Sequence, residues 1–76
     1  MIIFTKHAGV KLTQRKISKI LVTRTIESPD SRFKSRSNRI IFYKKFGRLY
    51  LSVIIKTEKN YTIVITAYWV AKIKKS

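Results

Sequence analysis

The chain has 76 residues, which is the length of one small domain, and no second domain fits. Its 18 Lys and Arg residues against three Asp and Glu give a formal net charge of +15, and nucleic acid is the commonest partner of so basic a surface. Apolar residues make up 45% of the sequence, which favours a compact core and excludes a disordered basic tail.

The chain contains no cysteine, which excludes a disulfide framework, a thiolate nucleophile and a CxxC-type zinc site. Its first ten residues, MIIFTKHAGV, carry no basic segment ahead of a long apolar run. No run approaches the about 18 apolar residues of a membrane span. We therefore expect a cytoplasmic protein without a signal peptide or a membrane partner.

The N-terminal segment predicts a short helix. Ile2–Phe4 is an apolar run that either forms an edge strand or packs beneath the core. Thr5 is a suitable N-cap for a helix over the residues that follow it. The spacing predicts that Ala8, Leu12 and Val10 face inward.

A second helix is predicted directly after the first. Ser18 is a suitable N-cap, and Ile17 and Val22 have the spacing of a hydrophobic staple. Pro29 disfavours helical geometry in the residue before it, so the helix is expected to end near Ser28.

Basic residues gather in the middle of the chain. Ser31–Ser37, SRFKSRS, has the composition of an exposed, mobile loop and is a candidate for gripping phosphate. Positive charge concentrated in this way favours a binding function over general solubility. The predicted nucleic-acid-binding residues are Arg32, Lys34, Arg36, Arg39, Lys44, Lys45 and Arg48.

The C-terminal half predicts three long strands. Arg39–Lys45 and Leu49–Thr57 form a hairpin around Gly47, and Asn60–Trp69 follows after a second tight connection. The tail, Val70–Ser76, either extends the last strand or frays. We predict a single α+β domain over residues 1–76, in which two N-terminal helices pack on one face of a three- to four-stranded antiparallel sheet.

Alternation in the strands predicts which side chains face the core. In the last strand the odd positions are assigned to the core, namely Tyr61, Ile63, Ile65, Ala67 and Trp69. The sheet face opposite the helices is left for a ligand and is predicted to carry Tyr50, Ser52, Ile54, Thr66 and Tyr68.

The acids and the single histidine restrict the chemistry. Three acids and one His do not supply the ligands of a catalytic metal, so no metal or other cofactor is expected. Cleavage of RNA without a metal ion is still compatible with these residues, because the 2′-hydroxyl of RNA is itself the nucleophile. In that case His7 transfers protons, Lys and Arg side chains hold the phosphate, and Thr66 and Tyr68 orient it.

Each of these residues also has a structural interpretation. His7 is equally well a surface residue at a helix start, and side chains such as Lys11 and Arg15 more often belong to a solvated helix face. Thr66 is a common strand residue, and Tyr68 covers a sheet as readily as it contacts a substrate. The aromatic residues Phe46, Tyr43 and Tyr50 have two interpretations. They stack on the bases of a nucleic acid, or they pack against neighbouring side chains of the sheet.

Four segments, taken in order and spacing, carry a family resemblance: KHAGVKLTQRKIS, TIESPD, RIIFYKKFGRLYLSVIIKT and VITAYW. Together they resemble the small toxin-like domains of the RelE/BrnT superfamily, over nearly the whole chain. The resemblance implies a RelE-like fold of two N-terminal helices against an antiparallel sheet. Lys16 departs from the pattern, because such domains often have Gly there.

The resemblance also implies an activity and a partner. RelE-like domains belong to a wider group of metal-independent ribonucleases and act in type II toxin–antitoxin pairs, in which an acidic antitoxin covers the basic face. The polar positions that match are His7, Lys11, Arg15, Thr66 and Tyr68. The expected function is a metal-independent endoribonuclease toxin. The alternatives are a non-catalytic nucleic-acid-binding protein of the same fold and a structural protein that binds an acidic partner.

Overall fold

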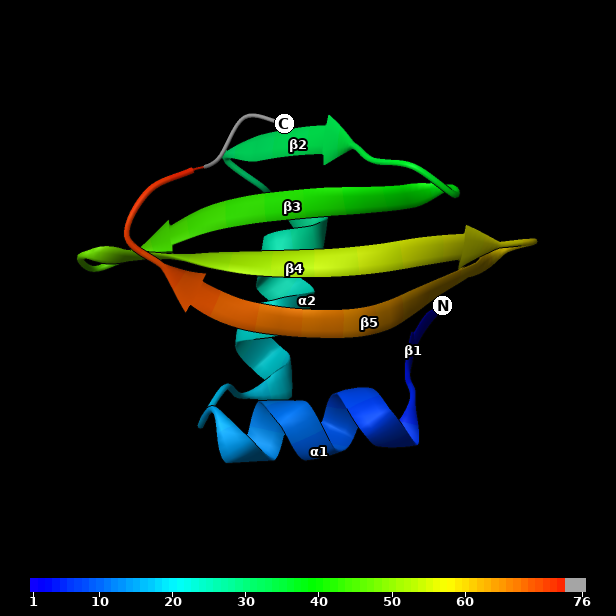
Figure 1. Cartoon of the computed structure of the whole chain (residues 1–76), viewed down its shortest axis with the longest axis horizontal. Coiled ribbons are helices and arrows are strands. Elements are labelled where there is room, and N and C mark those ends of the chain that lie inside the picture. Colours follow the sequence, from blue (N-terminus) through cyan, green and yellow to red (C-terminus); the bar gives the residue numbers. More distant parts are fainter. Residues whose placement is uncertain (74–76) are drawn as a thin grey trace.

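Two helices pack on one side of a five-stranded sheet in the computed structural model, which describes residues 1–73 (Figure 1). This confirms the predicted α+β class and the two N-terminal helices. The elements in chain order are β1 (Ile2–Phe4), α1 (Lys6–Gln14), α2 (Lys19–Glu27), β2 (Ser31–Lys34), β3 (Arg39–Phe46), β4 (Leu49–Glu58) and β5 (Tyr61–Val70).

The sheet has the strand order β1-β5-β4-β3-β2. Strands β3, β4 and β5 form the predicted antiparallel meander, with Gly47 in the left-handed region at φ 69° in the first turn. β1 is the edge strand that one interpretation of Ile2–Phe4 predicted, and it pairs in parallel with the first residues of β5. The sheet is therefore larger than predicted and mostly antiparallel.

The predicted mobile loop at Ser31–Ser37 is wrong for its first four residues, which form β2 and pair antiparallel with β3. The Phe33 ring makes an edge contact with the Tyr43 ring, with centroids 5.9 Å apart. The Asp30 amide donates to the Tyr43 carbonyl at 2.8 Å and fixes the start of the strand. The antiparallel pairing with β3, the Phe33–Tyr43 contact and the Asp30 bond together join this basic segment to the sheet.

Both helices begin at the predicted caps. The Thr5 hydroxyl accepts a 3.1 Å hydrogen bond from the Ala8 amide at the start of α1. The Ser18 hydroxyl accepts a 3.2 Å bond from the Leu21 amide at the start of α2. Helix α2 ends at Glu27, as the following proline predicted.

Helix α1 ends in a Schellman motif. The Ile17 amide donates to the Leu12 carbonyl at 2.9 Å, and the Lys16 amide donates to the Thr13 carbonyl at 3.2 Å. This places Lys16 in the left-handed region at φ 56°. Leu12 and Ile17 are both buried, so the motif also turns the chain back toward the sheet.

One inward position of α1 was predicted wrongly. Ala8 and Leu12 are buried, but Val10 is 48% exposed. Two residues correspond to about 200° of rotation in a helix, so Val10 lies on the side away from Ala8 and Leu12. The buried stripe of α1 is therefore narrow.

A β-bulge in β5 interrupts the alternation of its side chains. Ile54 pairs with Thr66, whereas its neighbour Ile55 pairs with Val64, so Ile65 has no partner of its own in β4. An extra residue in one strand moves every side chain on one side of the bulge to the opposite sheet face.

Because of the bulge, the prediction that odd positions of β5 face the core is wrong before Ile65 and correct beyond it. Val64 is fully buried at 0% exposure, whereas Tyr61, assigned to the core, is 43% exposed. Beyond the bulge Ala67 is buried and Trp69 packs against the core, as predicted. The final residues of the predicted tail, 74–76, lie outside the described residues, and β5 itself ends at Val70.

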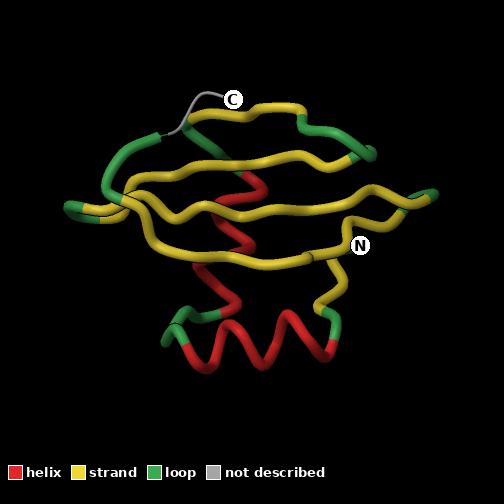
Figure 2. Tube along the Cα trace, in the orientation of Figure 1, coloured by secondary structure: helices red, strands yellow, loops and turns green. Residues whose placement is uncertain are grey.

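The core lies between the sheet and the two helices. Helix α1 packs on β5, and α2 crosses behind β4 and β3 (Figures 1 and 2). In both figures α1 extends along the β5 side of the sheet rather than behind its centre. The buried cluster consists of Ala8, Leu12, Ile17, Val22, Phe42, Leu51, Val53, Ile55, Val64 and Ala67.

Candidate functional site

The sheet face opposite the helices carries the residues that the strand pattern assigned to a ligand. We define the open face as the side chains of two cross-strand rows and one flanking residue. In Figure 1 α2 lies behind the strands, so the view is onto this face. The rows are Tyr43–Ser52–Tyr68 and Ile41–Ile54–Thr66, and Tyr50 flanks them.

Ser52 occupies the centre of the open face. It is 0% exposed, and within residues 1–73 its hydroxyl has no hydrogen-bond partner. Tyr43 and Tyr68 flank it in the neighbouring strands. Buried hydroxyls are normally bonded, so this hydroxyl between two tyrosines carries a desolvation cost that no hydrogen bond among the described residues offsets.

Arg15 reaches the margin of the open face from the end of α1. Its Nη1 donates to Thr66 Oγ1 at 2.8 Å and to the Ala67 carbonyl at 3.0 Å. Its guanidinium carbon lies 6.0 Å from the centroid of the Tyr68 ring. The structure therefore brings together three of the five predicted catalytic residues, namely Arg15, Thr66 and Tyr68.

The shortness of β1 gives Arg15 access to this position. β1 pairs only with Thr62, Ile63 and Val64 of β5, so within residues 1–73 the later part of β5 has no strand on that side. Arg15 is exposed, and Nη1 makes both bonds to β5. Nη2 and Nε take no part in them, and these are donors with the fork geometry that matches a phosphate.

Lys11 and His7 lie farther back along α1. Residues four apart share a helix face, so His7, Lys11 and Arg15 form one stripe. Four residues correspond to about 6 Å of helix rise, which puts Lys11 about 6 Å and His7 about 12 Å from Arg15 along the axis. Lys11 is half-buried and His7 is exposed. His7 therefore lies two helical turns from the Arg15–Thr66 contact.

Lys44 has a structural partner away from the open face. Its register partner is Leu51, a core residue, so its side chain lies on the helix side of the sheet. Its Nζ donates to the Ser28 carbonyl at 2.8 Å, at the C-terminus of α2. A cation at this end of a helix complements the helix dipole.

Lys45 and Arg39 are placed on the side of the open face. Lys45 Nζ lies 5.9 Å from the centroid of the Tyr50 ring, and its backbone amide donates to the Asp30 carboxylate at 2.8 Å. Arg39 pairs with Lys56, and both alternate with core-facing neighbours. Lys56 is a cation that the charge cluster at residues 32–48 did not include, although alternation in β4 would have revealed it.

The remaining predicted binding residues are divided between the turns and the other side of the sheet. Arg32 and Lys34 pair with Phe42 and Ile40, which face the helices. Arg36 lies in the β2–β3 connection and Arg48 in the β3–β4 turn. The seven basic residues thus do not form one continuous surface.

The described part of the chain, residues 1–73, holds no group of three or more His, Cys, Asp or Glu side chains that could bind a metal ion. Within the same residues no helix is long and apolar enough to cross a membrane. The open face itself presents hydroxyls and aromatic rings, and the Arg15 guanidinium lies at its margin.

Comparison with known proteins assigns the chain to a family. No curated protein and no solved structure matches the sequence. The sequence profile described as "Domain of unknown function (DUF4258)" matches residues 4–69, which include both helices, the meander and the Arg15–Thr66–Tyr68 contact. Since the match covers most of the chain, this protein belongs to the DUF4258 family.

Proposed function

We propose that this protein binds RNA across the open face. The observation that carries the proposal is the fixed position of Arg15, bonded to Thr66 and lying over Tyr68, at the margin of a tyrosine-bearing sheet face. The guanidinium would hold a phosphate with its Nη2 and Nε donors, because a planar fork matches two phosphate oxygens. The net charge of +15 would attract the polyanion from a distance.

Unpaired RNA suits the open face better than a duplex. Tyr68 is half-buried and Tyr50 lies beside Lys45, so aromatic surface and positive charge occur together there. Unstacked bases can lie on aromatic rings, whereas the bases of a duplex are covered by their neighbours. Cations at the margin, Arg15 and Lys45, would then follow the backbone.

The binding proposal is tested by fluorescence anisotropy with labelled single-stranded RNA and the matching duplex, in EDTA and at several salt concentrations. Tyr68→Ala should weaken single-strand binding roughly tenfold, since base stacking contributes about 1–3 kcal/mol. Arg15→Lys should weaken it similarly, because an ammonium lacks the bidentate fork. Arg24→Gln, on the exposed side of α2, is the matched control and should change affinity little. Equal losses in all three variants would refute an open-face site.

A second function, metal-independent RNA cleavage, is favoured by the alignment of His7, Lys11 and Arg15 along α1. In this proposal the RNA 2′-oxygen attacks the adjacent phosphorus and the bond to the 5′-oxygen breaks. His7 takes the 2′-hydroxyl proton and then gives it to the leaving 5′-oxygen, and Lys11 and Arg15 offset the charge of the phosphorane. The protein would then be a RelE/BrnT-like endoribonuclease toxin acting in the cytoplasm.

Cleavage is tested separately from binding. Wild-type protein is incubated with labelled RNA in EDTA beside His7→Ala and Tyr68→Phe, and the products are examined for 2′,3′-cyclic phosphate ends. Products from the wild type that His7→Ala abolishes would support the role of His7. Binding without any product would leave the RNA-binding proposal and refute the nuclease one.

An acidic protein partner belongs to the toxin proposal. Such an antitoxin would neutralise the basic surface and cover the open face, in competition with RNA. The test is to add a candidate acidic partner to the RNA complex and follow anisotropy. Release of RNA by the partner would support a shared surface, whereas a ternary complex would refute it.

A further inference from the structure

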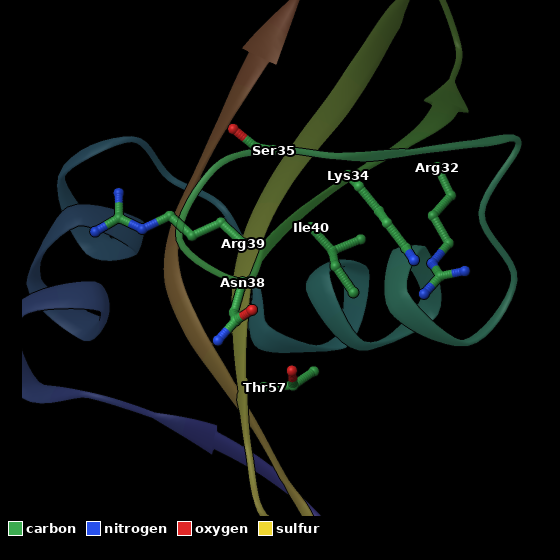
Figure 3. A pocket seen from close by; sticks show the side chains of 7 residues that line it. All are labelled: Arg32, Lys34, Ser35, Asn38, Arg39, Ile40 and Thr57. Carbon is green, nitrogen blue, oxygen red and sulfur yellow. The ribbon is translucent and has the colours of Figure 1, made fainter.

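A pocket of about 380 Å³ lies at the β2–β3 turn, and none of the residues that define the open face lines it (Figure 3). In the figure the Arg32 and Lys34 side chains extend to the same side, next to Ile40, and Asn38 and Thr57 stand on the other wall. The lining residues are Arg32, Lys34, Ser35, Asn38, Arg39, Ile40 and Thr57. This volume is in the range of small-ligand sites in proteins.

The charge of the pocket points to an anion. Arg32 and Lys34 are two residues apart on β2, so they share a sheet face and their Cβ atoms are separated by about 7 Å. None of the seven lining residues is acidic. Two neighbouring cations without a carboxylate in the lining repel each other, and an anion between them would relieve that repulsion.

The β2–β3 turn fixes the polar wall of the pocket. Ser37 and Asn38 both adopt left-handed geometry at φ 61°, and the Arg39 amide donates to the Arg36 carbonyl at 3.3 Å. Two left-handed residues at the centre of such a turn give type I′ geometry, which normally favours glycine. The Ser35 amide closes the strands by donating to the Arg39 carbonyl at 2.8 Å. Asn38 is thereby held at the pocket by a tight turn.

The remaining surfaces favour a ligand with a flat or apolar body. Ile40 is half-buried and provides apolar surface beside Lys34. The Asn38 amide and the Thr57 hydroxyl offer donors and acceptors for the edge of a base or a ribose. We propose that this pocket binds a phosphomonoester carried by a nucleoside, with the phosphate between Arg32 and Lys34 and the nucleoside against Ile40, Asn38 and Thr57.

The pocket is distinct from the open face and does not depend on the proposed RNA site. Arg32 and Lys34 lie on the helix side of the sheet, as their partners Phe42 and Ile40 show. In Figure 3 the Arg39 guanidinium extends away from the group formed by Lys34 and Arg32. The phosphate could belong to a free mononucleotide or to the end of an RNA strand, and the chemistry of recognition is the same.

The test uses the full-length protein labelled with ¹⁵N and titrated with inorganic phosphate, a nucleoside, and the matching nucleoside 5′-monophosphate. The monophosphate should shift the amide signals of residues 32–40 and 57 and bind at least tenfold more tightly than either part alone. Two RNA oligomers, with and without a 5′-phosphate, identify the source of the ligand. Selective binding of the phosphorylated strand at these residues supports a strand end, and binding of the mononucleotide alone supports a free nucleotide.

Variants separate this pocket from general attraction to a basic protein. Asn38→Asp changes little in size but adds a carboxylate, and it should weaken monophosphate binding at least tenfold. Lys34→Gln should do the same, whereas Lys72→Gln, beyond the end of β5, removes one charge elsewhere and should have little effect. Equal losses in Lys34→Gln and Lys72→Gln, or signal shifts centred on Arg15 and Thr66, would overturn the proposal. If Tyr68→Ala binds the nucleoside 5′-monophosphate as well as the wild type does, the pocket does not depend on the RNA site.

Discussion

The Arg15 guanidinium and the Thr66 hydroxyl lie 2.8 Å apart and join the end of α1 to β5. The same Nη1 atom also donates to the Ala67 carbonyl at 3.0 Å. Because β1 pairs only with the first part of β5, no strand among the described residues pairs with this carbonyl on that side. Arg15 therefore has a structural role at the edge of the sheet, and that role exists before any ligand binds.

Arg15→Lys should lower the free energy of unfolding by about 1 kcal/mol, because one ammonium does not reproduce the two bonds to Thr66 and Ala67. Thr66→Val, which removes only the side-chain acceptor, should cost less. Urea denaturation monitored by circular dichroism measures both. Arg24→Lys is the control and should change stability by less than about 0.5 kcal/mol. If Arg15→Lys behaves like this control, the contact does not stabilise the edge of β5.

Ser52→Ala should leave the protein as stable as the wild type or more stable by up to about 1 kcal/mol. The reason is that its buried hydroxyl has no partner among the described residues, so its removal ends an uncompensated desolvation cost. Thr25→Val is the matched comparison, since that hydroxyl is equally buried but donates to the Leu21 carbonyl at 2.8 Å. It should be destabilising by about 1 kcal/mol in the same urea experiment. A similar loss for Ser52→Ala would mean that Ser52 is bonded in solution.

The bulge at Ile65 predicts unequal effects at two adjacent positions of β5. Val64→Ala should cost about 2 kcal/mol, because Val64 is fully buried in the core. Ile63→Ala should cost less although it removes more carbon, since Ile63 is only half-buried and pairs with Lys56 across the strands. Thermal or urea unfolding of both variants measures the difference. A larger loss of stability for Ile63→Ala than for Val64→Ala would show that Ile63 faces the core, as strict alternation along the strand predicts.

The parts of the fold that were predicted correctly depend on local signals. Thr5 and Ser18 cap helices through bonds to residues three positions ahead, and Gly47 makes a turn between adjacent strands. The open face followed from alternation in β4, which has no bulge of its own between Leu49 and Ile54. Such signals need only a few neighbouring residues to be recognised.

The parts that were missed depend on contacts between distant residues. β2 pairs with β3, where Phe33 contacts Tyr43, and nothing in SRFKSRS alone reveals that partner strand. The bulge at Ile65 is set by the pairing of β5 with β4, and the side chain of Lys44 is directed by the end of α2. At the candidate site, the grouping of Arg15, Thr66 and Tyr68 was predicted. The separation of His7 from this group could not be predicted, because it depends on how α1 lies against β5.

Lys16→Gly should raise the free energy of unfolding by about 1 kcal/mol. Lys16 occupies the left-handed position of the Schellman motif at φ 56°, where a side chain is disfavoured and glycine is the usual residue. Urea denaturation measures the gain. Gly9→Ala, in the middle of α1, is a useful companion because, apart from its chain neighbours and the nearby backbone of α1, no described atom lies within 4 Å of the added carbon, and the helix propensity improves by about 1 kcal/mol. A loss of stability in Lys16→Gly would show that the Lys16 side chain makes a contact worth more than the backbone strain.

Lys44→Met and Lys45→Met remove the same charge from adjacent residues and should have different effects. Lys44→Met should cost about 1 kcal/mol of stability, because its Nζ bonds the Ser28 carbonyl at the end of α2. It should leave the salt dependence of RNA binding nearly unchanged. Lys45→Met should leave stability nearly unchanged but reduce the slope of log K against log salt by about 0.7, the value for one phosphate contact with a single strand. Urea unfolding and anisotropy titrations at four salt concentrations measure both quantities for each variant. Equal changes in slope would mean that the two lysines act only through net charge, and the assignment of Lys45 to the RNA surface would then be wrong.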